Sequence, residues 1–150
     1  MGTHYKGSRK ETDALNSYIK LIRAAESLNS KINLELSKHD LTESQFGVLD
    51  ALLHLGPLKQ KEIGKKILKS GGNITMVIDN LEKQDLVQRK RGEKDRRHFI
   101  VHLTVKGKNN ILDVLPYIIE IIKKHFDILN SAEQKEFQRL CKITGLQVRL

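Results

Sequence analysis

The side chains of this chain that could do chemistry are mostly basic, and they gather in its middle third. Residues 56 to 110 contain 14 Lys and Arg against 6 Asp and Glu. Residues 1 to 55 contain 7 of each, and residues 111 to 150 contain 6 against 5. The net charge of +9 therefore comes almost entirely from one segment. Positive charge segregated in this way favours a polyanionic partner, either nucleic acid or an anionic membrane surface.

The placement of the basic residues separates these two partners. A membrane-surface protein usually carries a basic amphipathic helix, whereas here the charge lies on two short helical patterns around a turn and on a hairpin pattern. No run approaches the roughly 20 apolar residues that span a bilayer. Residues 1 to 10 lack the apolar core of a signal peptide. We expect a cytoplasmic protein with no membrane partner, bound to double-stranded DNA.

Other kinds of chemistry find little support. The single cysteine, Cys141, excludes an intrachain disulfide framework and a Cys-based metal cluster. No nucleotide-binding loop, Ser/His/Asp arrangement or pair of carboxylates in an identifiable cleft is found. Two histidine groups lack the spacing of a metal motif: His39 with His54 and His125, and His98 with His102. The sequence predicts no enzyme, no cofactor and no metal site.

The elements that must position the basic residues are mainly helical. Residues 1 to 11 have no periodicity and are expected to form a mobile basic arm. A long helix of about 25 residues should begin at Thr12. A second helix opens at Thr42, which forms a capping box with Gln45, and ends at Gly56 and Pro57.

Two short helices and a hairpin should follow. The third helix covers Lys59 to Leu68, and 69 to 72 form a turn. The fourth helix, about Asn73 to Gln84, buries Ile74, Val77, Ile78 and Leu81. Strands at Leu86 to Arg91 and His98 to Thr104 make a two-stranded wing.

The last third of the chain should form two further helices. Thr104 caps the fifth, which carries apolar residues on more than one face, so that a second copy of the chain would have to cover it. Pro116 should kink or split that helix. Ser131 and Gln134 should form the capping box of the sixth. The expected fold class is mainly α with a small two-stranded β-wing (α+β), as one structural unit per chain.

From Pro57 onward the residues PLKQKEIGKKILKSGGNITMVIDNLEKQDLVQRKRGEKDRRHFIVHLT resemble the winged helix-turn-helix of the MarR family of bacterial transcription regulators. The signals are Ile74-Thr75 to Leu81-Glu82-Lys83, the Asp95-x-Arg97 wing motif, and Leu103-Thr104. The order of elements also matches over nearly the entire chain. Two positions depart from the family: Asp85 stands where Gly is usual, and Lys59 replaces a Ser or Thr cap.

The resemblance implies a homodimer that binds a pseudo-palindromic operator, with half-sites about 10 bp apart. Residues 12–40 and 105–150 would form the dimerisation helices, and 41–104 the winged helix-turn-helix. Members of the family are typically repressors released from DNA by a small ligand, often phenolic or otherwise aromatic. A DNA-binding architectural protein without sequence preference is the alternative.

The expected DNA contacts fall into three groups. A helix in the major groove reads bases through its exposed side chains, here Asn73, Thr75, Met76 and Asn80. Backbone amides near Ser70 and Gly72 would approach a phosphate at the helix start. Phosphate contacts, which position the protein without reading sequence, are expected from Gln60, Lys61, Lys65, Arg89, Lys90 and Arg91.

The wing has a different expected task. Lys94, Arg96 and Arg97 project from its tip, and one arginine should enter a narrow A·T-rich minor groove. By resemblance, Arg97 is the family's wing arginine. Asp79 is expected to pair with Arg97 and so set the wing against the fourth helix, and Asp95 is a second wing-positioning residue. A ligand would bind between the first, second and fifth helices, where the candidate lining residues are Tyr18, His39, Phe46 and His54, although Tyr18 and Phe46 also suit a plain core.

Overall fold

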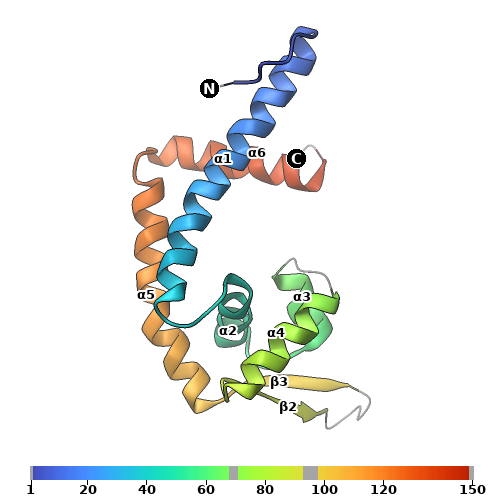
Figure 1. The fold of residues 1–150 in the computed structure, drawn as a ribbon, viewed down its shortest axis with the longest axis vertical. Coiled ribbons are helices and arrows are strands. Elements are labelled where there is room, and N and C mark those ends of the chain that lie inside the picture. The colour runs from blue at the N-terminus through green and yellow to red at the C-terminus, as the bar shows by residue number, and fades with distance from the viewer. Residues whose placement is uncertain (1, 68–70, 93–97, 149–150) are drawn as a thin grey trace.

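The structure is a computed structural model that describes residues 2–67, 71–92 and 98–148. Six helices and three short strands follow in the order α1 (Arg9–Ser37), α2 (Glu43–Leu55), β1 (Leu58–Lys59), α3 (Gln60–Lys66), α4 (Gly71–Lys83), β2 (Val87–Arg91), β3 (Phe99–Leu103), α5 (Val105–Phe126) and α6 (Ser131–Leu146). Figure 1 shows α1 and α5 side by side, with α2, α3, α4 and the sheet gathered at one end of them. α6 follows at the opposite end of α5 and crosses α1 part-way along its length.

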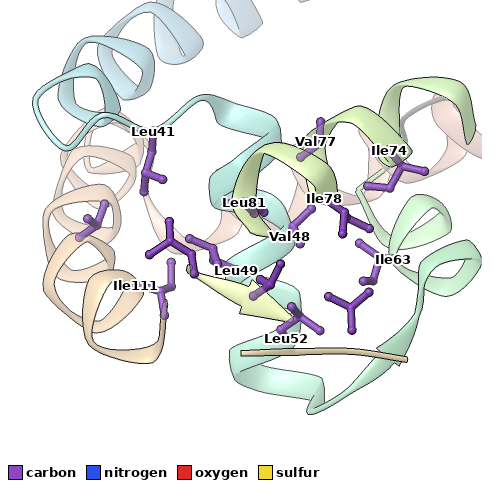
Figure 2. Packing of buried hydrophobic residues seen from close by; sticks show 14 of the residues in the cluster. Leu41, Val48, Leu49, Leu52, Ile63, Ile74, Val77, Ile78, Leu81 and Ile111 are labelled. Atoms are coloured by element: carbon purple, nitrogen blue, oxygen red, sulfur yellow. The ribbon is translucent and has the colours of Figure 1, made fainter. Parts of the chain in front are cut away.

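Most of the hydrophobic core lies within residues 41–104, the winged unit, and α1 and α5 add a few residues to it. Leu49, Ile63, Ile78 and Leu81 are completely or almost completely buried, and they come from α2, α3 and α4. Figure 2 shows these helices converging on one cluster, which Ile111 joins from α5. α1 contributes one buried residue and α6 contributes none. The two end helices therefore leave most of their apolar surface uncovered within one chain.

The predicted two-stranded wing is confirmed as β2 paired with β3, and a third strand, β1, joins the same sheet. The strand order is β1-β3-β2, all antiparallel, and β1 pairs Leu58 with Val101. β1 is two residues long and directly precedes α3, so it shows no alternation of its own. Pairing with the central strand β3 supplies the hydrogen bonds that hold it in place.

Helix starts follow their capping residues, and two of them differ from the prediction. The predicted Thr42–Gln45 box caps α2. α1 begins at Arg9 rather than Thr12, because Ser8 and Glu11 form a reciprocal capping box. α6 is capped by Asn130 with Glu133.

Gln134 has a different role from the one predicted with Ser131. Its side-chain amide donates to the carbonyls of Phe126 and Leu129, so it closes the α5–α6 corner instead of the helix start. Asn130 is the better cap because its side-chain oxygen accepts from the Glu133 N–H at 3.0 Å.

Two further expectations about helix boundaries are revised. Gly71 and Gly72 open α4 instead of forming the turn before it. Pro116 does not split α5, which runs unbroken from Val105 to Phe126. Val114 and Ile118, on either side of the proline, are both buried against the same core, which holds the two halves in one helix.

Candidate nucleic-acid interface

The exposed face of α4 carries the polar side chains predicted to read bases. Asn73, Thr75 and Asn80 are exposed, and Met76 is 58% exposed. The opposite face is anchored by Ile74, Val77, Ile78 and Leu81, all buried. The 3.6-residue period of the helix separates the two faces. The core therefore holds the helix firmly while its polar face stays open to a partner.

Basic side chains flank this helix. On α3, Lys61 and Lys65 are exposed. They line a hollow of about 680 Å³ between α3 and β3, whose floor includes Ile74 and Phe99. On β2, Lys90 and Arg91 are exposed, and the guanidinium of Arg91 lies 5.7 Å from the centre of the Phe99 ring. Cations on both sides of α4 suit the phosphates on both sides of a DNA groove.

The tip of the wing is not among the described residues. Lys94, Asp95, Arg96 and Arg97 lie outside them, as does Ser70 before α4. The described part of the hairpin ends where the Gly92 N–H donates to the His98 carbonyl at 3.0 Å.

Arg89 has a role other than the predicted phosphate contact. Its side chain, 18% exposed, forms ion pairs with Asp79 at 2.6 Å and Glu82 at 2.7 Å. Glu82 also accepts the backbone N–H of Arg89 at 3.1 Å. Both carboxylates lie on α4 and Arg89 lies on β2, so this cluster fastens the wing to the exposed helix. The pair predicted between Asp79 and Arg97 stays a prediction, because Arg97 lies outside the described residues; the partner that the structure describes for Asp79 is Arg89.

Gln60 extends the same cluster towards the base-reading face. Its side-chain carbonyl accepts from Arg89 Nη2 at 3.4 Å, and its amide nitrogen donates to Thr75 Oγ1 at 2.6 Å. Arg89 Nη2 also approaches the Thr75 carbonyl at 3.5 Å. Sequence reasoning missed this network because no period relates α3, α4 and β2.

A second contact region fixes the base of α5 to the end of α4. Asp85, which stands where the family usually has Gly, adopts a left-handed conformation with φ of 59°. The Thr104 hydroxyl donates to the Asp85 carbonyl at 2.6 Å, and Lys106 Nζ donates to the Gln84 carbonyl at 2.8 Å. A side chain at Gly107 would overlap the Leu86 carbonyl. The long helix α5 is thus joined rigidly to the turn after α4.

The four ligand candidates are only partly brought together. Phe46 and His54 line one hollow of about 500 Å³ between α2, α3 and α5, where Ile32 of α1 also contributes. His54 Nδ1 lies 3.1 Å from Asp50 Oδ1 in this hollow. Tyr18 is 61% exposed on α1. His39 packs on Tyr117, with ring centres 5.6 Å apart, and neither it nor Tyr18 lines the hollow.

Residues 2–67, 71–92 and 98–148 include no group of three or more His, Cys, Asp or Glu side chains able to hold a metal ion. Over the same ranges, no helix has the length and hydropathy to cross a membrane. Cys141 is exposed on α6.

Comparison with known proteins places this arrangement in a family. A sequence model of the MarR family matches residues 41–99, which hold α2, α3, α4 and the wing strand β2. The transcriptional regulator MhqR of Bacillus subtilis is 34% identical over 136 residues, covering 91% of this chain and 94% of MhqR. The chain belongs to the MarR family. A second relative, the HTH-type transcriptional regulator YkoM of the same organism, is 32% identical over 89% of this chain and 86% of its own length.

Solved structures share the fold of this chain. AbsC of Streptomyces coelicolor, a MarR family regulator, superposes with a TM-score of 0.85 at 18% identity, covering 95% of this chain and 97% of AbsC. BpsR of Bordetella bronchiseptica gives 0.77 at 25% identity, covering 86% and 98%. MarR proteins are DNA-binding transcription regulators and not enzymes, and this chain is one of them.

Proposed function

We propose that this MarR-family chain represses transcription as a homodimer that binds a pseudo-palindromic operator and is released by a small aromatic ligand. The proposal that the protein reads DNA bases rests on the two faces of α4. Its buried face is locked in the core and its exposed face carries Asn73, Thr75, Met76 and Asn80, with cations on both sides. Rigid presentation of polar side chains is what base reading in the major groove needs.

The dimer is supported by the apolar surface that one chain leaves open. On α1, Leu21 and Ile22 are 45% and 38% exposed, and on α6, Leu140 is 49% exposed. Between these helices lies an apolar hollow of about 350 Å³, which includes Leu21 and Phe137. A second copy would remove this surface from water at roughly 25 cal/mol per Å². Two linked α4 helices would then face successive major grooves.

The ligand is supported by the hollow that Phe46 and His54 line. A largely apolar wall with a few polar groups is typical of small-molecule sites. The polar residues that line this hollow are Glu43, Ser44, Asp50, His54 and Lys66. BpsR, whose DNA binding is regulated by 6-hydroxynicotinic acid, is 25% identical to this chain. We take an aromatic acid or phenol as the ligand class.

Competition binding tests the proposed function. A duplex enriched from a randomised library should outcompete random duplex by roughly 10³-fold or more at physiological salt. A ratio near one at every salt concentration would instead identify a non-specific architectural protein, whose affinity depends on phosphate charge alone. Adding 6-hydroxynicotinic acid and a panel of hydroxybenzoic acids to the specific complex tests the ligand class separately.

A further inference from the structure

A chain of three hydrogen-bonding side chains runs from the ion-pair cluster to the exposed face of α4. It begins at the guanidinium of Arg89, passes through Gln60 and ends at the hydroxyl of Thr75. Arg89 is mostly buried, Gln60 is half-buried and Thr75 is exposed. The donor-to-acceptor direction of these hydrogen bonds decides whether the Thr75 hydroxyl donates to DNA or accepts from it.

The orientation of the Gln60 amide follows from its neighbours. A guanidinium has donors only, so the Gln60 atom that faces Arg89 Nη2 at 3.4 Å has to be the carbonyl oxygen. The NH₂ group then faces Thr75 Oγ1, and the 2.6 Å separation makes that contact the shorter of the two. Asp79 and Glu82 fix Arg89 in turn, at 2.6 and 2.7 Å.

A free threonine hydroxyl both donates and accepts, so it discriminates poorly between bases. Here Gln60 occupies one lone pair of Thr75 Oγ1. In this series of hydrogen bonds Arg89 donates to Gln60 and Gln60 donates to Thr75, so each donor points away from the guanidinium. Hydrogen bonds in series polarise one another. The hydroxyl hydrogen at the outer end is therefore the strengthened group.

We propose that Gln60 is a positioning residue that makes Thr75 a hydrogen-bond donor, so that α4 selects a base with a major-groove acceptor at that position. Such acceptors are N7 and O6 of guanine, N7 of adenine and O4 of thymine. The inference rests on the proposed sequence-specific function. It replaces the phosphate contact expected from Gln60 and gives Thr75, one of the expected base-reading side chains, a hydrogen bond to donate.

Two variants test the direction of these hydrogen bonds. In Gln60→Glu the carboxylate still accepts from Arg89 but can no longer donate, so the Thr75 hydroxyl turns its hydrogen inwards and presents a lone pair to DNA. The preferred base should change to one that donates, adenine N6 or cytosine N4, by roughly fivefold. Thr75→Val, which leaves Arg89 and Gln60 in place, should lose the preference at that one position and keep the rest of the motif.

The experiment is selection from a randomised duplex library with the full chain, followed by binding to the enriched duplexes. Lys61→Gln is the matched control: it makes the net charge more negative by one unit, as Gln60→Glu does, on the same helix. It should weaken binding to every duplex by a similar factor without changing the motif. Thermal melting of each variant confirms that it is folded.

The outcomes separate the two proposals. A wild-type protein that enriches no motif overturns the proposed function. If the wild-type protein enriches a motif and both Gln60→Glu and Thr75→Val enrich the same one, the inference alone is overturned. The Thr75 hydroxyl would then donate to a backbone carbonyl of the helix instead of to DNA. Duplexes carrying 7-deazapurines at the affected position should bind about fivefold more weakly than normal ones if N7 is the acceptor. Unchanged binding of the 7-deaza duplexes assigns the contact to O6 or O4. The two variants then decide whether the Thr75 hydroxyl donates to that atom.

Discussion

At the scale of single residues, Arg89 matters to the DNA-binding surface chiefly through its ion pairs, which hold β2 against α4, and less through its charge. Asp79 and Glu82 are one turn apart on α4, and their carboxylates are 46% and 40% exposed. Removing the arginine would leave two carboxylates close together without their cation. The pairs are partly open to water, so their stabilising contribution is smaller than that of a buried ion pair.

The first prediction concerns this cluster. Arg89→Ala should lower the free energy of unfolding by about 1 to 2 kcal/mol, measured by urea denaturation, because both ion pairs are lost. Operator affinity should fall more than the charge change alone explains, since the wing is no longer held to α4. Lys90→Ala removes the same charge from the neighbouring, exposed position. Equal losses of affinity in the two variants would contradict the fastening role.

The second prediction concerns the wing tip. Arg97→Ala should weaken operator binding by about 1 to 3 kcal/mol, because the minor-groove potential no longer holds an arginine. Lys90→Ala should weaken binding to all sequences alike. Fluorescence anisotropy with the enriched and random duplexes measures both. An operator affinity that Arg97→Ala leaves unchanged would show that the wing assignment is wrong.

At the scale of elements, α5 matters because it connects the winged unit to the helices at the other end of the chain. Thr104, Lys106 and Gly107 at its start all contact the turn that follows α4. A displacement of α5 would therefore move the end of α4 with it. Such a connection would let ligand binding near α5 change the spacing of two recognition helices.

The third prediction tests this connection. Gly107→Ala should destabilise the protein by about 1 to 3 kcal/mol, because the added methyl group overlaps the Leu86 carbonyl and the backbone has to shift. Gly145→Ala on α6 is the control, since nothing lies within 4 Å of the added carbon, and it should be neutral or slightly stabilising. A Gly107→Ala protein that melts like the wild type would mean that α5 is loosely joined.

Local signals in the sequence predicted most elements, and tertiary contacts account for most of the misses. The α2 cap was recognised because Thr42 and Gln45 precede a clear apolar pattern. The Ser8 and Glu11 pair was missed because the residues around it are polar and show no period. At α6, Asn130 and Ser131 are adjacent candidates, and the choice depends on Gln134 bonding back to α5.

The site shows the same division between local and tertiary information. The exposed face of α4 followed directly from its helical period, and Asn73, Thr75, Met76 and Asn80 are exposed as expected. The role of Arg89 did not follow, because its partners lie 7 and 10 residues earlier in the chain on another element. Strand β1 is too short to show alternation and becomes visible only when β3 pairs with it.

At the scale of the whole molecule, one chain has a closed core at one end and uncovered apolar helices at the other. Most of the buried cluster belongs to the winged unit, residues 41–104, whereas Leu21, Leu140 and Phe137 on α1 and α6 are all at least 37% exposed. This division suits a protein whose end helices pair with a second copy.

The fourth prediction tests the pairing. Leu21→Glu should shift the protein from dimer to monomer in sedimentation velocity, because a carboxylate would be buried in the apolar interface. Val105→Glu introduces the same charge at the start of α5, where the side chain is 80% exposed, and should stay dimeric. A dimer of unchanged stability in Leu21→Glu would exclude α1 from the interface.

The central claim is that two copies of the chain read one DNA site together. The most direct measurement is sequencing of duplexes that the purified full chain enriches from a randomised library. The account predicts an inverted repeat whose half-sites are centred about 10 bp apart. Enrichment of no motif, or of one unrepeated half-site bound by a single chain, would contradict it.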